Sequence, residues 1–138
     1  MKYKLNNCTL TLDLKPGIYS LGRQSATGKT YILNLLKQVS AAYQEYKILA
    51  VSYNELTEEE LIQRLSCNTY DIIMVDRYDI WGSKMIDYAL YKQKDNAIIL
   101  LDVKDLNNVL FEINSLADIQ ISFGEVLVSK YVDSVFRR

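Results

Sequence analysis

The chain has 138 residues, of which 49% are hydrophobic and 24% are charged, which fits one compact domain with a sizeable core over residues 1–138. Its 16 basic and 17 acidic residues give a formal net charge of -1, so no overall field attracts it to nucleic acid or to an anionic membrane. No run approaches the roughly 20 apolar residues of a membrane span and no signal-peptide pattern is present, so we expect a cytoplasmic protein.

The histidine and cysteine counts restrict the chemistry. The chain contains no histidine, and its two cysteines, Cys8 and Cys67, lie far apart. These counts exclude the usual zinc spacings and every histidine-based catalytic triad. Any catalysis must therefore depend on carboxylates, lysine, arginine, hydroxyl groups or a bound metal.

The N-terminal segment has the pattern of short strands. Leucines alternate with polar residues over 9–14, as in a half-buried strand, and Asn6-Asn7 can join this strand to another at 3–5. Pro16 and Gly17 suit a turn, after which we expect the chain to double back into a strand over 18–21. The prediction here is a set of antiparallel strands that leads into 18–21.

A long helix is predicted after Thr30, because apolar residues recur there at helical spacing. Its apolar residues are Ile32, Leu35, Leu36, Val39 and Tyr43. A buried strand over 47–53 follows, and Thr57 with Glu60 then forms a capping box for a helix that ends near Cys67.

The same alternation continues toward the C-terminus. We predict strands over 70–76 and 97–101, and helices over 83–94 and 105–116. The helix over 83–94 has Ser83 as its N-cap, and its inward stripe is Met85, Ile86, Ala89 and Leu90. Strand–helix alternation predicts an α/β fold with a mainly parallel sheet.

The chain is predicted to close with a hairpin. Strands over 118–123 and 126–131 flank Gly124-Glu125, and glycine in the first position of a two-residue loop suits a type II′ turn.

Residues 22–30 read Gly-Arg-Gln-Ser-Ala-Thr-Gly-Lys-Thr, between the strand at 18–21 and the long helix. This is the Walker A pattern of a phosphate-binding loop, which is met at Gly28, Lys29 and Thr30. Arg23 occupies the first glycine position, and Gly22 stands one place too early. Arg23 is either a contact to phosphate or partner, or a solvated surface residue.

Each part of this loop has a chemical task. Backbone N–H groups at a helix N-terminus bind phosphate, and the residues that would provide them here are Ser25, Ala26, Thr27 and Gly28. Lys29 would reach the β and γ oxygens, and the Thr30 hydroxyl would ligate Mg²⁺. Asp76 ends a strand and would hold the same Mg²⁺ through water; the alternatives are a solvated carboxylate or an ion pair with Arg77.

This pairing resembles the Walker A and Walker B motifs of P-loop NTPases, and the whole chain resembles the ABC and RecA-like branch of that family. The resemblance implies a three-layer P-loop fold with the core order 5-1-4-3-2. In that order the strands would be the last strand, 18–21, 97–101, 70–75 and 47–53. The resemblance also implies ATP and Mg²⁺ as cofactors, Tyr3 as a residue that stacks on adenine, and Asp102 as a polar sensor.

Three departures from the family concern Arg23, the absent ABC signature sequence and, above all, Arg77. Arg77 follows Asp76 at the position where this branch usually has a catalytic glutamate, and it cannot act as a base. Asp79 or Asp102 could take that role. Arg77 would instead stabilise charge at a neighbouring subunit's nucleotide, or pair with Asp79. Trp81 is either structural or part of a nucleotide rim or interaction surface.

Two functions therefore remain as hypotheses. The first is a minimal ATP-Mg-binding NTPase whose hydrolysis is weak or depends on a protein partner or a second copy. The second is a degenerate, non-hydrolysing P-loop protein that acts as an interaction or regulatory module. Guanine specificity is not supported, because Lys104-Asp105-Leu106 does not provide the required element. Whether the chain is an enzyme stays open.

Overall fold

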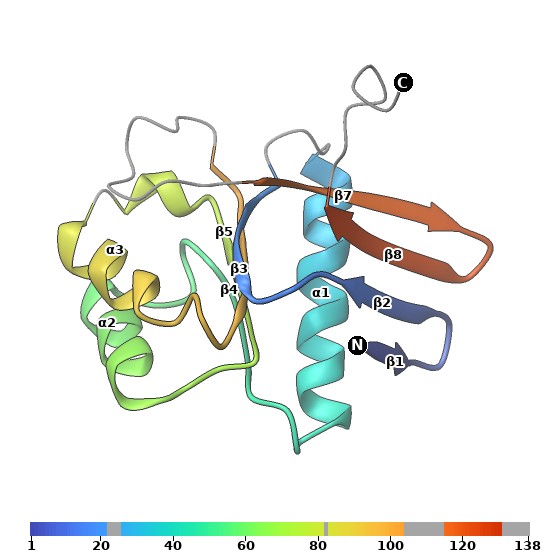
Figure 1. The fold of residues 1–138 in the computed structure, drawn as a ribbon, viewed down its shortest axis with the longest axis horizontal. Helices are drawn as coiled ribbons and strands as arrows, with labels where there is room; N and C mark the ends of the chain where they lie inside the picture. The colour runs from blue at the N-terminus through green and yellow to red at the C-terminus, as the bar shows by residue number, and fades with distance from the viewer. Residues whose placement is uncertain (22–25, 82, 104–114, 131–138) are drawn as a thin grey trace.

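The computed structural model describes residues 1–21, 26–81, 83–103 and 115–130, in which three α-helices pack on one mixed sheet of eight strands (Figure 1). The elements in chain order are β1 (Lys2–Lys4), β2 (Thr9–Asp13), β3 (Gly17–Ser20), α1 (Ala26–Ala42), β4 (Ile48–Ser52), α2 (Glu58–Cys67), β5 (Ile72–Asp76), the 3₁₀ helix η1 (Tyr78–Ile80), α3 (Lys84–Tyr91), β6 (Ile98–Leu101), β7 (Ser115–Ser122) and β8 (Glu125–Lys130). Across the sheet the strands lie in the order β1-β2-β8-β7-β3-β6-β5-β4.

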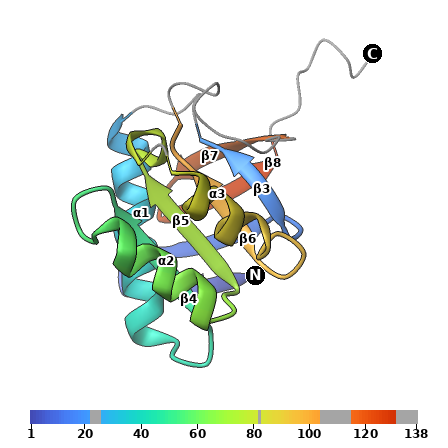
Figure 2. The ribbon, with the colours of Figure 1, turned by 90° about the vertical axis from the view of Figure 1, so that its left-hand side faces the viewer.

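The strands β3, β6, β5 and β4 form the parallel half of the sheet. Helix α1 covers one face of this half, whereas α2 and α3 lie side by side on the other face (Figure 2). Every residue of β6 and the first four residues of β5 are consequently buried. This confirms the prediction from the continuous apolar runs, since such runs are typical of parallel strands that are covered on both faces.

The strands β1, β2, β8 and β7 form the other half, which lies on the other side of α1 in Figure 1; we call it the antiparallel half after its two antiparallel pairs, β1–β2 and β7–β8. Strand β1 pairs antiparallel with β2, as predicted, and β2 alternates between buried and more exposed residues. The expectation that β2 doubles back onto β3 is wrong. Strand β3 is flanked by β6 and β7, so β2 pairs with β8 instead, in parallel.

The predicted helix signals are confirmed at two N-termini. Thr57 and Glu60 form the capping box of α2, and the Ser83 side chain accepts a hydrogen bond from the Ile86 N–H at the start of α3. The predicted stripe of α3 is wrong at Met85, which is 65% exposed, because α3 turns Asp87 inward to meet the Tyr78 hydroxyl. Helix α3 also ends at Tyr91, three residues before the predicted end.

The C-terminal hairpin is present with a different turn from the one predicted. Its loop is Phe123-Gly124, because Ser122 pairs with Glu125. Both loop residues have positive φ, 43° and 78°, which is the type I′ pattern and not type II′. This register buries Val126 and Val128 against α1, whereas a shift by one residue would turn them outward.

Some predictions fall outside the described residues. They concern residues 22–25 of the predicted loop and residues 105–114 of the helix predicted over 105–116. Residues 115 and 116 of that helix belong instead to β7. None of the helices in the described ranges is long and apolar enough to cross a membrane.

Candidate functional site

The parallel half of the sheet brings four polar side chains to one edge. Lys29 lies in the first turn of α1, which follows β3, while Ser52 and Asp76 end β4 and β5 and Asp102 follows β6. The register pairs Ser52 with Asp76, and Val75 with Leu101, so the carboxyl ends of these strands are level. Open parallel sheets bind their ligands at this edge.

A buried ion pair joins α1 to β6. The Lys29 Nζ lies 2.6 Å from the Asp102 Oδ1, and the two residues are only 7% and 3% exposed. Burial by itself disfavours the ionised carboxyl, but the hydrogen bonds from Lys29, Asp76 and the Arg77 N–H, together with the Lys29 charge, outweigh it and lower the pKa of Asp102. Asp102 is therefore an anion that holds the lysine of the predicted loop.

Asp102 also organises the segment that follows β5. Its Oδ2 accepts a hydrogen bond from the Arg77 backbone N–H at 3.2 Å, and its backbone carbonyl accepts one from the Tyr78 N–H at 2.8 Å. Because one residue contacts both α1 and the start of η1, a change at Lys29 would be felt directly at Arg77 and Tyr78.

Asp76 lies between this carboxylate and β4. Its Oδ2 accepts a hydrogen bond from the Ser52 hydroxyl at 3.0 Å. Burial and the neighbouring Asp102 carboxylate raise the pKa of Asp76, although the Ser52 hydroxyl partly opposes them. The two carboxyl groups therefore titrate as a pair, in which Asp102 is the more acidic.

The donors at this edge fit a small, hard cation. Carboxylate and hydroxyl oxygens are the ligands that Mg²⁺ prefers, and Mg²⁺ usually needs only one or two protein carboxylates. Thr30 is exposed near the start of α1, beside Lys29. Asp76 lies next to the Asp102 carboxylate, and a bound cation would reduce the repulsion between these two acidic groups. Within the described residues, no group of three or more acidic or cysteine side chains forms a complete metal cage.

Arg77 has an unusual backbone and an aromatic neighbour. Its φ of 53° lies in the left-handed region, which non-glycine residues seldom adopt. Its guanidinium carbon lies 5.2 Å from the ring centroid of Tyr53, the residue that follows β4. Ion pairs with Asp76 or Asp79 are not found for Arg77 in the part of the chain that the structure describes, so both pairing alternatives are wrong for this state.

The segment after β5 is also fastened to α3. The Tyr78 hydroxyl donates a hydrogen bond to the Asp87 Oδ1 at 2.5 Å, and both residues are buried. Burial and this carboxylate raise the pKa of Tyr78, so the hydroxyl stays protonated and remains a donor. Nearby, the buried Asp79 Oδ1 and Trp81 Nε1 have no hydrogen-bond partner among the described residues.

The structure does not bring Tyr3 to this edge. Tyr3 is 1% exposed, and its ring packs edge-on against Tyr43 and Tyr46, which lie just after the C-terminal end of α1. Burial and the neighbouring Tyr46 raise the pKa of Tyr3 to about 12. A residue that stacks on adenine needs an open ring face beside the loop, so this position does not fit that prediction.

The structure places most of the other predicted residues. Arg23 and Ser25 lie outside the described residues, and only the helical backbone of Ala26 and Thr27 is described. The side chains that the structure does bring together are Lys29, Asp76 and Asp102. Asp79 lies in η1, three residues beyond Asp76.

Sequence reasoning missed Ser52, Tyr53 and Tyr78 as neighbours of the site. A polar residue at the end of a predicted strand was the available signal for Ser52, as it was for Asp76.

Comparison of the chain with protein-family models, curated proteins and solved structures finds no match.

Proposed function

We propose that the chain binds a nucleoside triphosphate together with Mg²⁺, and that the nucleotide is ATP. The observation that carries this proposal is the buried ion pair of Lys29 with Asp102, 2.6 Å long, in the first turn of α1 and directly after Gly28. A lysine held at the carboxyl edge of a parallel sheet stands where phosphates bind. In this proposal, the nucleotide phosphates replace the Asp102 carboxylate as the partner of Lys29.

The sheet supports a P-loop fold for the chain. Strands β7, β3, β6, β5 and β4 are neighbours in that order, and this is the order 5-1-4-3-2 that the resemblance to P-loop NTPases implies. Helices cover both faces of the parallel half, which supports the three-layer arrangement. The loop motif, the strand order and the converging side chains are independent arguments for the same binding function.

Mg²⁺ would be held by the Thr30 hydroxyl and, through water, by Asp76. When bound, it would neutralise phosphate charge during binding and phosphoryl transfer. Release of Lys29 leaves the Asp102 carboxylate buried without its partner, and an uncompensated buried charge costs several kcal/mol. Mg²⁺ next to Asp76 supplies positive charge at the same edge, so we expect ATP to bind much more weakly without Mg²⁺.

Hydrolysis is expected to be weak or to depend on a partner. Arg77 cannot serve as a base, and Asp102 is a poor one because its pKa is lowered and it already accepts two hydrogen bonds. Asp79 is the remaining carboxylate on this segment. The second candidate function, a non-hydrolysing interaction module, is favoured by Arg77, which lies over Tyr53 where the family has a glutamate.

Thermal unfolding with and without ATP-Mg tests the binding proposal. Saturation at about 100 times the dissociation constant adds roughly 2.7 kcal/mol of stability. Thr30 is exposed, so Thr30→Ala should fold like the wild type and lose most of the nucleotide-induced shift, while Thr30→Ser keeps it. Lys29→Ala should abolish the shift. Because this variant leaves the buried Asp102 carboxylate without its ion-pair partner, its melting curve without nucleotide must be recorded as the control for folding. A wild type that shows no shift at about 1 mM ATP-Mg contradicts the proposal.

Phosphate release then separates the two candidate functions. We expect slow release by the wild type and less by Asp79→Ala, with ATP binding retained. Equal release by Asp79→Ala would exclude Asp79 as the base. If binding is retained but no release occurs, with or without a partner, the interaction module is the better description.

A further inference from the structure

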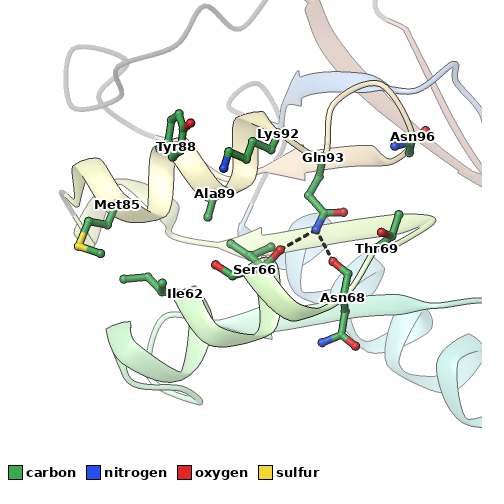
Figure 3. Close-up of a pocket in the computed structure, with 11 residues that line it drawn as sticks. Ile62, Ser66, Asn68, Thr69, Met85, Tyr88, Ala89, Lys92, Gln93 and Asn96 are labelled. Atoms are coloured by element: carbon green, nitrogen blue, oxygen red, sulfur yellow. Dashed lines mark hydrogen bonds between the residues drawn. The ribbon is translucent and has the colours of Figure 1, made fainter.

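Helices α2 and α3 leave a groove between them on the surface of the parallel half (Figure 3). We call it the α2–α3 groove. Its walls and floor include Ile62 and Leu65 of α2 and Met85, Tyr88 and Ala89 of α3. A shallow continuation toward the start of α2 is lined by Thr57, Glu58, Glu59, Ile62, Gln63 and Met85.

The groove exposes apolar side chains that a lone domain would normally bury. Met85 and Tyr88 are each 65% exposed, and both are on α3. Met85 lies beside Ile62, and Tyr88 lines the same groove from α3, so apolar side chains of both helices share one surface. Contiguous apolar surface of this kind typically marks an interaction site.

The polar groups at the other end of the groove are already used. The Gln93 amide donates hydrogen bonds to the carbonyls of Leu65 and Asn68, at 2.9 and 2.6 Å, and its oxygen accepts one from the Tyr70 N–H at 3.1 Å. This clasp ties α3 to the end of α2. Gln93 is therefore committed to the fold and is not available to orient a small polar ligand.

Charge is separated along the groove. Helices α2 and α3 run in the same direction, because each connects neighbouring parallel strands on the same face of the sheet. The helix N-termini lie at one end, where Glu58 and Glu59 line the groove. Lys92 lines the other end, with its Nζ 4.3 Å from the Tyr88 ring centroid. Lys84, in the first turn of α3, is not a lining residue.

We propose that the α2–α3 groove binds a second copy of this chain in an antiparallel, two-fold dimer. A two-fold axis across the middle of the groove brings the acidic end of each copy onto the basic end of the other, so that Met85, at the acidic end, packs toward Tyr88 and Lys92 of the second copy. The same rotation sets the two helix dipoles of one copy antiparallel to the two of the other, which is the favourable arrangement. Such a contact is self-complementary, as a closed dimer requires. Parallel docking would instead oppose like charges.

Sedimentation velocity over a range of concentrations, without nucleotide, tests this dimer. The wild type should show a concentration-dependent dimer, and Met85→Glu or Tyr88→Glu should weaken it by about tenfold or more, because each variant places a charge on an apolar part of the interface. Tyr91→Ser is the matched control, since Tyr91 is 45% exposed on the same helix but does not line the groove. Circular dichroism melting curves verify that each variant is folded.

A charge exchange tests the antiparallel geometry. Glu58→Lys with Glu59→Lys should weaken the dimer, and so should Lys92→Glu, whereas the triple variant should recover most of the wild-type affinity. A wild type that stays monomeric up to about 1 mM overturns the proposal and leaves the groove to a different partner chain. A dimer that is unaffected by Met85→Glu and Tyr88→Glu also overturns it, because the contact then uses another face.

Discussion

The parallel and antiparallel halves of the sheet bury their side chains in different ways. In the parallel half, consecutive residues such as Ile72, Ile73 and Met74 are all buried, because α1 covers one face and α2 and α3 cover the other. In the antiparallel half, β2 and β8 alternate, and their buried residues face α1. No described helix covers the outer face of that half.

This difference in burial explains where polar side chains occur in each half of the sheet. A strand that is covered on both faces has no room for charge along its length, so polar side chains are confined to its ends. Asp76 ends β5 and Asp102 follows β6; the two carboxyl groups are neighbours there, and Asp102 contacts Lys29 at the start of α1. A strand that is covered on one face has polar residues on its other face, spread along its length. Thr9, Thr11 and Asp13 of β2 are an example, and they do not gather at one site.

The largest expected effect contrasts two carboxylates at strand ends. Asp102→Ala should reduce the free energy of unfolding by roughly 3–5 kcal/mol, because it leaves the buried Lys29 ammonium without its partner. Asp13→Ala, at the exposed end of β2, should change it by less than about 0.5 kcal/mol. Urea unfolding of both variants gives the two values. Similar values would mean that the Lys29–Asp102 pair is not buried in solution.

The next effect compares inner positions of one strand from each half. Ile73→Ala in β5 should cost about 2–5 kcal/mol, although both of its neighbours point to the opposite face. Thr11→Ala, between the buried Leu10 and Leu12 of β2, should stay within about 0.5 kcal/mol. The same unfolding experiment measures both. A large cost at Thr11 would show that the outer face of β2 is covered in solution.

The smallest effect concerns the paired carboxyl groups and depends on pH. The pKa of Asp76 is raised in the folded state, so the protein loses stability as the pH rises through that pKa. Asp76→Asn imitates the protonated carboxyl and can still accept the Ser52 hydrogen bond. The variant should therefore be the more stable protein at neutral pH, and the difference should vanish below the ordinary aspartate value of about 3.9.

Unfolding curves at several pH values measure this difference, with Asp13→Asn as the control for an exposed carboxylate. A variant that is less stable than the wild type at neutral pH would show that Asp76 is stabilised as an anion, and would contradict the raised pKa.

Local patterns predicted much of the parallel half. The continuous apolar runs, the Thr57 capping box and the Ser83 N-cap all act within a few residues, so they can be identified without the fold. Carboxylates at strand ends could likewise be named as site candidates. The contact between Asp102 and Lys29 could not be derived from spacing alone. The two residues are 73 positions apart and touch only because β6 lies next to β3.

The antiparallel half was predicted less well because its contacts are nonlocal. Strand β2 could pair with β3 or with a distant strand, and only the neighbours of β3 decide between them. Tyr3 is buried because its ring packs against Tyr43 and Tyr46, which are distant in sequence. An alternating pattern alone could not distinguish such a buried ring from an exposed one. The left-handed backbone of Arg77 has no sequence signal of its own.

Calorimetric titration of ATP-Mg into the wild type and Thr30→Ala tests the central claim most directly. We predict one binding site in the wild type, affinity at least about tenfold weaker in Thr30→Ala, and recovery in Thr30→Ser, since the exposed hydroxyl serves the metal and not the fold. Absence of binding by the wild type, or equal affinity in Thr30→Ala, would contradict the assignment of this edge of the sheet to a nucleotide and Mg²⁺.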